Sequence, residues 1–118
     1  MKSRKSTLTA ISLHLGTLIA EYDLTISSAL REMERFEVSS ETFCRNSAIV
    51  CVASFAISYL RRVKKMADET DYKTTENFIR FHKHQLEAKA TDGTDTLHFA
   101  QNNVIMMFGK LIDLFFDK

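Results

Sequence analysis

His82 is the side chain in this sequence whose type and position most suggest chemistry. Helical spacing places it on an apolar face, one turn from Phe78 and one turn from Leu86. The preceding apolar segment carries a strip of small residues at helical spacing: Ser47, Cys51, Ser54 and Ser58. An imidazole beside a thiol or a hydroxyl can activate a nucleophile or bind a small polar ligand. If the two faces meet, His82, Ser47, Cys51 and Ser54 form a polar pocket; otherwise His82 is a neutral core histidine and the strip lets helices pack closely.

Arg45 and Asn46 suggest a different chemistry. An arginine followed by a polar residue, with a histidine about one turn later on the same helix, is the motif of HEPN ribonucleases, which are small α-helical bundles that use the pair across a dimer. The segment RNSAIVC at 45–51 resembles that motif, with valine or cysteine where the histidine belongs. The resemblance implies a degenerate, RNA-active helical bundle that lacks its catalytic base. The alternative is an ion pair between Arg45 and Glu41, one turn earlier.

Basic side chains could contact nucleic acid at six positions. These are Arg45, Arg61, Arg62, Lys65, Arg80 and Lys83. The chain as a whole has 16 Lys and Arg against 15 Asp and Glu, a formal charge of +1, so no global field attracts it to nucleic acid or to an anionic membrane. We therefore interpret the basic residues as a solvated surface and keep nucleic-acid binding as the alternative function.

Metal and cofactor motifs are not evident in the sequence. His82 and His84 are two residues apart and diverge on a helix, and no carboxylate and histidine stand at the spacing used by metal sites in helical bundles. The sequence also has no glycine-rich phosphate loop and no nucleophile elbow. We therefore expect no metal and no cofactor, and an enzyme is the less favoured class.

The composition predicts a fold made of helices. The 118 residues contain no proline, three glycines and no tryptophan, which leaves too few turn residues for many short strands. At 45% hydrophobic and 26% charged residues, the chain is long enough to bury a core as one domain. Apolar periodicity predicts an all-α, four-helix antiparallel bundle spanning 1–118, with helices at about 6–37, 40–67, 74–90 and 95–116. The pattern does not decide whether the first helix is continuous or bent.

The expected second helix is the most apolar. Its uncharged run, Ala48–Leu60, is shorter than the roughly 20 residues of a membrane span, so we expect a central helix covered on most sides and no membrane insertion. Cys44 and Cys51 lie two helical turns apart, too far for a disulfide, and are expected to be buried thiols in a reducing compartment. The basic start of the chain lacks an apolar signal core. These features predict a cytoplasmic protein.

The fourth expected helix is apolar on too many sides for a bundle edge. Its apolar residues cover roughly 200° of a helical wheel, where a surface helix needs about 100°. Phe99 and Met106 lie even on its polar side. We expect a homodimer or a protein partner to cover this helix, with an interface at Phe99, Met106, Leu114 and Phe116. The favoured function is a small, non-enzymatic interaction or regulatory protein.

Overall fold

The computed structural model describes residues 3–35, 37–89 and 95–116 of the chain. Four α-helices follow one another: α1 (Arg4–Glu34), α2 (Ser40–Glu69), α3 (Tyr72–Lys89) and α4 (Thr96–Leu111), and α4 continues into a π-helical turn at Ile112–Phe116. The described residues contain no strand, so the predicted all-α, four-helix fold is confirmed. The first helix is a single uninterrupted helix.

Short polar side chains begin the helices. Ser39 accepts a hydrogen bond from the Thr42 N–H at 3.1 Å and caps α2. Asp71 accepts a hydrogen bond from the Thr74 N–H at 2.8 Å, directly before α3 begins at Tyr72. Each cap satisfies one of the free N–H groups in the first turn of its helix.

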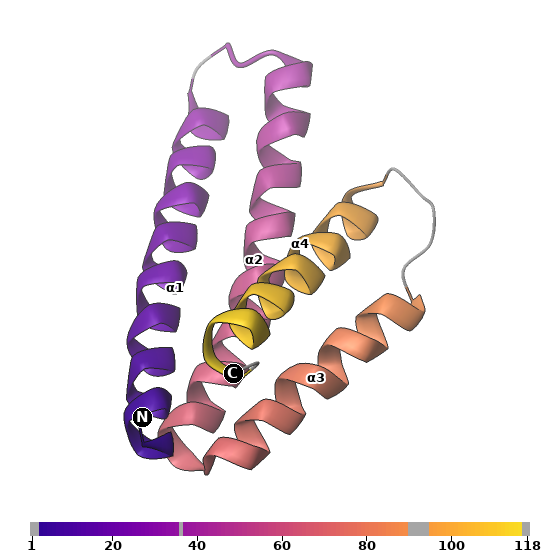
Figure 1. Ribbon diagram of the computed structural model, residues 1–118. Coiled ribbons are helices and arrows are strands. Elements are labelled where there is room, and N and C mark those ends of the chain that lie inside the picture. Colours follow the sequence, from indigo (N-terminus) through magenta and orange to yellow (C-terminus); the bar gives the residue numbers. More distant parts are fainter. Residues whose placement is uncertain (1–2, 36, 90–94, 117–118) are drawn as a thin grey trace.

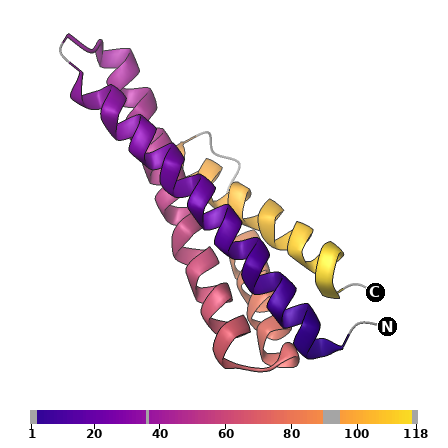
Figure 2. The same ribbon diagram turned by 90° about the vertical axis from the view of Figure 1, so that its left-hand side faces the viewer.

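α1 and α2 form a long antiparallel hairpin, and α3 and α4 cover only one end of it (Figure 1). Seen from the side, α4 lies against the lower half of the hairpin and the upper half extends beyond it (Figure 2). The molecule measures 56 × 29 × 20 Å. We call residues 23–50 the projecting end, and the rest of the described chain, where all four helices meet, the base.

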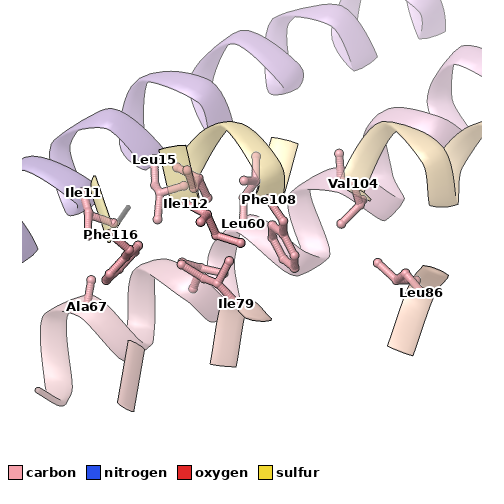
Figure 3. Packing of buried hydrophobic residues seen from close by; sticks show 13 residues of the cluster. Ile11, Leu15, Leu60, Ala67, Ile79, Leu86, Val104, Phe108, Ile112 and Phe116 are labelled. Atoms are coloured by element: carbon pink, nitrogen blue, oxygen red, sulfur yellow. The ribbon is translucent and has the colours of Figure 1, made fainter. Parts of the chain in front are cut away.

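The hydrophobic core lies in the base (Figure 3). In the described part of the chain, the large apolar side chains that are completely buried all belong to it: Ile11, Leu15, Leu60, Val63, Ile79, Val104, Phe108 and Leu111. They come from all four helices, so each helix contributes one apolar stripe to a common interior.

The projecting end has almost no core. Among its described residues only Ala29 and Asn46 are buried, whereas Leu24, Leu30, Phe43 and Ile49 are exposed. The expectation that the second helix is covered on most sides is therefore wrong, because even in the base Cys51, Ser54 and Ser58 leave one side of it exposed. The projecting end is uncovered because α3 and α4 have 18 and 16 residues against 31 and 30 in α1 and α2.

The two thiols are exposed, contrary to the expectation that they are buried. Cys44 and Cys51 are exposed on α2 together with Ser54 and Ser58. Among the described residues, α2 is also the one helix long and apolar enough by composition to cross a membrane. Only 28% of its most apolar window is buried within the chain. Much of this apolar stretch therefore has no cover inside the molecule.

Candidate interaction surface

A groove opens where the projecting end leaves the base. It has a volume of about 360 Å³ and almost entirely apolar walls. Its lining comes from α1, α2 and the first turn of α4: Tyr22, Thr25, Arg45, Ala48, Ile49, Val52, Ala53, Thr96 and Phe99. We call it the junction groove. A second shallow depression, which shares Thr25 and Ile49 with it, continues toward the tip of the hairpin past Ala29 and Glu32.

The junction groove exists because the first turn of α4 lies beside the middle of α2, whereas the apolar face of α2 continues beyond it toward the hairpin tip. Ile49 belongs to the helical face that carries Ala53, Leu60 and Val63, all of which are buried. Ile49 itself is 37% exposed, because no third helix reaches it. Small side chains at Thr25 and Ala48 leave the space between the helices open.

A polar network holds α4 against α1 at the lower edge of the groove. The Asn103 side-chain amide donates to the Tyr22 hydroxyl at 3.1 Å, and that hydroxyl donates to the Met107 sulfur at 3.2 Å. At the start of α4, Asp95 accepts a hydrogen bond from the His98 N–H at 2.8 Å. These contacts fix the position of α4, and with it the depth of the groove.

Arg45 is the one charged residue in the lining of the groove, and Asp95, the N-cap of α4, directly precedes the lining residue Thr96. Both side chains are exposed. Within the described residues no ion pair joins Arg45 to Glu41, so the predicted local pair is not formed.

Most of the predicted interface on α4 and the π-helical turn is exposed. Phe99, Met106 and Leu114 are 59%, 62% and 53% exposed. Phe116, placed in the interface by the sequence, is only 7% exposed, and its ring lies 5.0 Å from the Tyr72 ring in the base. The π-helical turn that begins at Ile112 changes the angular step per residue, and so turns Phe116 inward where a regular helical wheel places it outside.

The predicted polar pocket around His82 is not assembled in the described chain. The imidazole of His82 is surrounded by aromatic rings, whose centroids lie 4.3 Å (Phe78), 5.2 Å (Phe81) and 5.8 Å (Tyr59) from its own. Burial and, to a lesser extent, Arg62 lower the pKa of His82, so the ring packs as a neutral group.

The residues that the sequence grouped with His82 lie elsewhere. Ser47 donates to the Met33 sulfur of α1 at 3.4 Å, and Cys51 is exposed. Ser54 lines an open depression together with Asp23 and Arg61. The strip of small residues therefore lies beside α1 and not beside His82 of α3. Small-ligand binding at His82 stays a prediction without an assembled site.

Half of the predicted nucleic-acid contacts are neutralised locally. Arg80 pairs with Glu76 at 2.9 Å, Lys83 pairs with Glu87 at 2.9 Å, and Arg61 lies 4.0 Å from Asp23. Of the others, the Arg62 guanidinium lies over the Tyr59 ring at 5.1 Å, Lys65 is exposed, and Arg45 lines the groove. The six cations therefore do not form one continuous surface, and nucleic-acid binding stays a prediction.

Asn46, the second residue of the HEPN-like pair, has a structural role. It is buried, and its side-chain amide donates to the Thr42 carbonyl at 2.9 Å within α2. Within the described residues, no three His, Cys, Asp or Glu side chains stand close enough to hold a metal ion.

Sequence reasoning missed the junction groove, although a signal for it was present. The periodicity marks Ile49 and Val52 as core residues, because it reports which face is apolar and not whether another helix reaches it. The unequal lengths of the predicted helices already implied that part of the first hairpin is uncovered. Comparison of the chain with protein-family models, with curated proteins and with solved structures found no match.

Proposed function

We propose that this chain is a small, non-enzymatic interaction protein that acts through the apolar surface at its junction groove and associates as a homodimer. The observation that carries the proposal is the projecting end, a pair of helices with apolar side chains on its surface and no core of its own. Helices owe most of their stability in water to tertiary packing. The projecting end has no third helix packed on it, so its helices are only marginally stable unless a partner covers them.

The exposed apolar side chains at the groove favour association. Complete burial of a Leu, Ile or Phe side chain contributes about 1.5–3 kcal/mol, while association costs about 4–15 kcal/mol in lost freedom. The exposed large apolar residues that line the groove and the depression next to it are Leu24, Ile49 and Phe99. A dimer that covers the groove on both copies buries this set twice for a single association cost.

A second copy fits this surface on general grounds. A symmetric contact uses the same patch on both chains, so one apolar patch is enough to form it. The chain is also close to neutral, with a formal charge of +1, so two copies do not repel each other strongly.

Light scattering across a dilution series tests the proposal. We expect a mass near twice 13.6 kDa at high concentration. Ile49→Asp places a charge in the groove and should give a monomer, whereas Leu13→Asp, an exposed leucine of the base, should leave the mass unchanged. Circular dichroism confirms that both variants stay helical. A monomeric wild-type protein at every concentration, or an equal response of the two variants, would contradict the proposal.

Two variants on α4 separate the groove from the outer side of that helix. Phe99 lines the groove, whereas Met106 lies outside it. We expect Phe99→Asp to break the dimer and Met106→Asp to weaken it less. The reverse order would move the interface to the outer side of α4.

A further inference from the structure

We propose that the junction groove of a single chain binds an amphipathic monocarboxylate, with the carboxylate at Arg45 and an unbranched hydrocarbon tail along the apolar wall. One chain supplies the whole site, so the binding itself does not depend on the proposed homodimer. The tail takes the space that a second copy would cover, and the ligand therefore competes with dimerisation. That competition alone rests on the proposed function.

The cation in the wall of the groove has no partner within the described chain. Arg45 is the one charged residue in the lining. Glu41 stands one turn earlier on α2, at the spacing that favours a helical ion pair, yet among the described residues Arg45 makes no ion pair. By contrast, Arg35, Arg80 and Lys83 each pair with a glutamate three or four residues away. The Arg45 guanidinium is thus available to an external anion, and its planar donors match a carboxylate.

The carboxylates near the groove are already engaged. Asp95, at the start of α4, accepts a backbone N–H as the cap of that helix. Glu32, in the depression beside the groove, pairs with Arg35 at 3.1 Å. The residues that line the groove include no Asp and no Glu. A negative charge at Arg45 therefore meets a cation and no acidic side chain in the wall.

The rest of the wall is suited to a hydrocarbon tail. Arg45 and Val52 are seven residues apart on α2, so they share one side of the helix and lie about 10 Å apart along its axis. Ala48 and Ile49 line the groove between them, and Phe99 of α4 lines it too. The volume of about 360 Å³ falls within the range of small-molecule sites. An extended chain advances about 1.2 Å per bond, so decanoate, an unbranched ten-carbon acid, has the required length.

Calorimetric titration of the full-length chain with decanoate tests the site. The protein is first diluted until light scattering shows a monomer, so that dimerisation does not contribute to the heat. We expect saturable binding of one decanoate per chain, with affinity rising by up to about four-fold for each methylene added between octanoate and decanoate. Binding of many molecules per chain, or no saturable binding, would overturn the proposal.

The role of the charge is tested with decanol and decyltrimethylammonium, which carry the same tail. Decanol should bind more weakly than decanoate, and the cation most weakly. Arg45→Gln should weaken decanoate about five-fold and leave decanol unchanged, while Arg45→Lys should retain most of the affinity. Arg31→Gln is the matched control, because Arg31 is an exposed arginine of the projecting end that does not line the groove. Equal losses in Arg45→Gln and Arg31→Gln, or equal affinities for the three ligands, would overturn the assignment of the carboxylate to Arg45.

The position of the tail is tested by filling the groove. Ala48→Phe places a large ring on the wall between Arg45 and Val52, and it should abolish decanoate binding while circular dichroism shows unchanged helicity. Retained affinity in this folded variant would overturn the placement of the tail.

Light scattering with decanoate separates this inference from the homodimer. At concentrations at which the wild type is a dimer, saturating decanoate should lower the mass toward 13.6 kDa. A dimer that persists with decanoate bound would overturn the competition and move the dimer contact away from the groove. Decanoate binding to a chain that is monomeric at every concentration would support the ligand site and contradict the homodimer.

Discussion

The base and the projecting end are two halves of the same helical hairpin with opposite environments. In the base, Leu60 of α2 is completely buried among four helices. In the projecting end, Ile49 stands three turns earlier on the same face of α2 and is 37% exposed. The two side chains are similar in size and hydrophobicity, so the difference comes from the reach of α3 and α4. An apolar helical face becomes core or interface according to whether another helix extends over it.

Truncation of these two residues gives the largest expected difference between the halves. Leu60→Ala should lower the free energy of unfolding by about 2–5 kcal/mol, because it opens a cavity in a closed core. Ile49→Ala should cost less, about 1 kcal/mol in dilute solution, where the residue is already 37% exposed. Urea unfolding followed by circular dichroism measures both.

Protein concentration sharpens this comparison. If the groove is a dimer surface, the cost of Ile49→Ala should grow as the wild-type protein is concentrated, because only dimerisation buries that side chain. The cost of Leu60→Ala should not depend on concentration. An Ile49→Ala variant as unstable as Leu60→Ala in dilute solution would mean that the projecting end already has a core within one chain.

The helix cap at the tip gives a smaller effect, confined to the projecting end. Ser39→Ala removes the acceptor of the Thr42 N–H and should cost about 1 kcal/mol of local helix stability. Hydrogen exchange of the first turns of α2 should then accelerate about five-fold, while global unfolding changes little. Ser40→Ala is the matched control, because Ser40 lies inside the helix and does not cap it. Equal acceleration by both substitutions would show that the cap does not hold this end together.

The sequence was informative wherever a local rule determines the structure. Periodicity predicts the four helices in the order in which the structure has them. It failed where the outcome depends on elements distant in sequence. The exposure of Cys44 and Cys51 depends on which side of α2 the other helices occupy. The inward turn of Phe116 depends on a local change of helical pitch that a uniform helical wheel cannot represent.

The candidate site shows the same limit. The sequence predicts Phe99 as an apolar residue on the polar side of the fourth helix, and in the structure Phe99 lines the groove. The other groove residues, such as Ala48 and Ile49, carry an ordinary core pattern. Their exposure follows only from the geometry of α4, which is set by long-range contacts such as that between Asn103 and Tyr22.

The smallest expected effect is a pH dependence that belongs to the base. Burial, and then Arg62, lower the pKa of His82 below its ordinary value of 6.5. The unfolded chain therefore binds a proton near that value, whereas the folded chain binds it only at lower pH. The free energy of unfolding should consequently fall as the pH drops from about 7.5 to about 5.5.

His82→Gln should lose less stability over this interval than the wild type does, while His84→Gln, which removes an exposed imidazole two residues away, should lose as much. Urea midpoints of the three proteins at both pH values measure the difference. Equal losses in all three would show that the aromatic rings around His82 leave it as accessible to protons as it is in the unfolded chain.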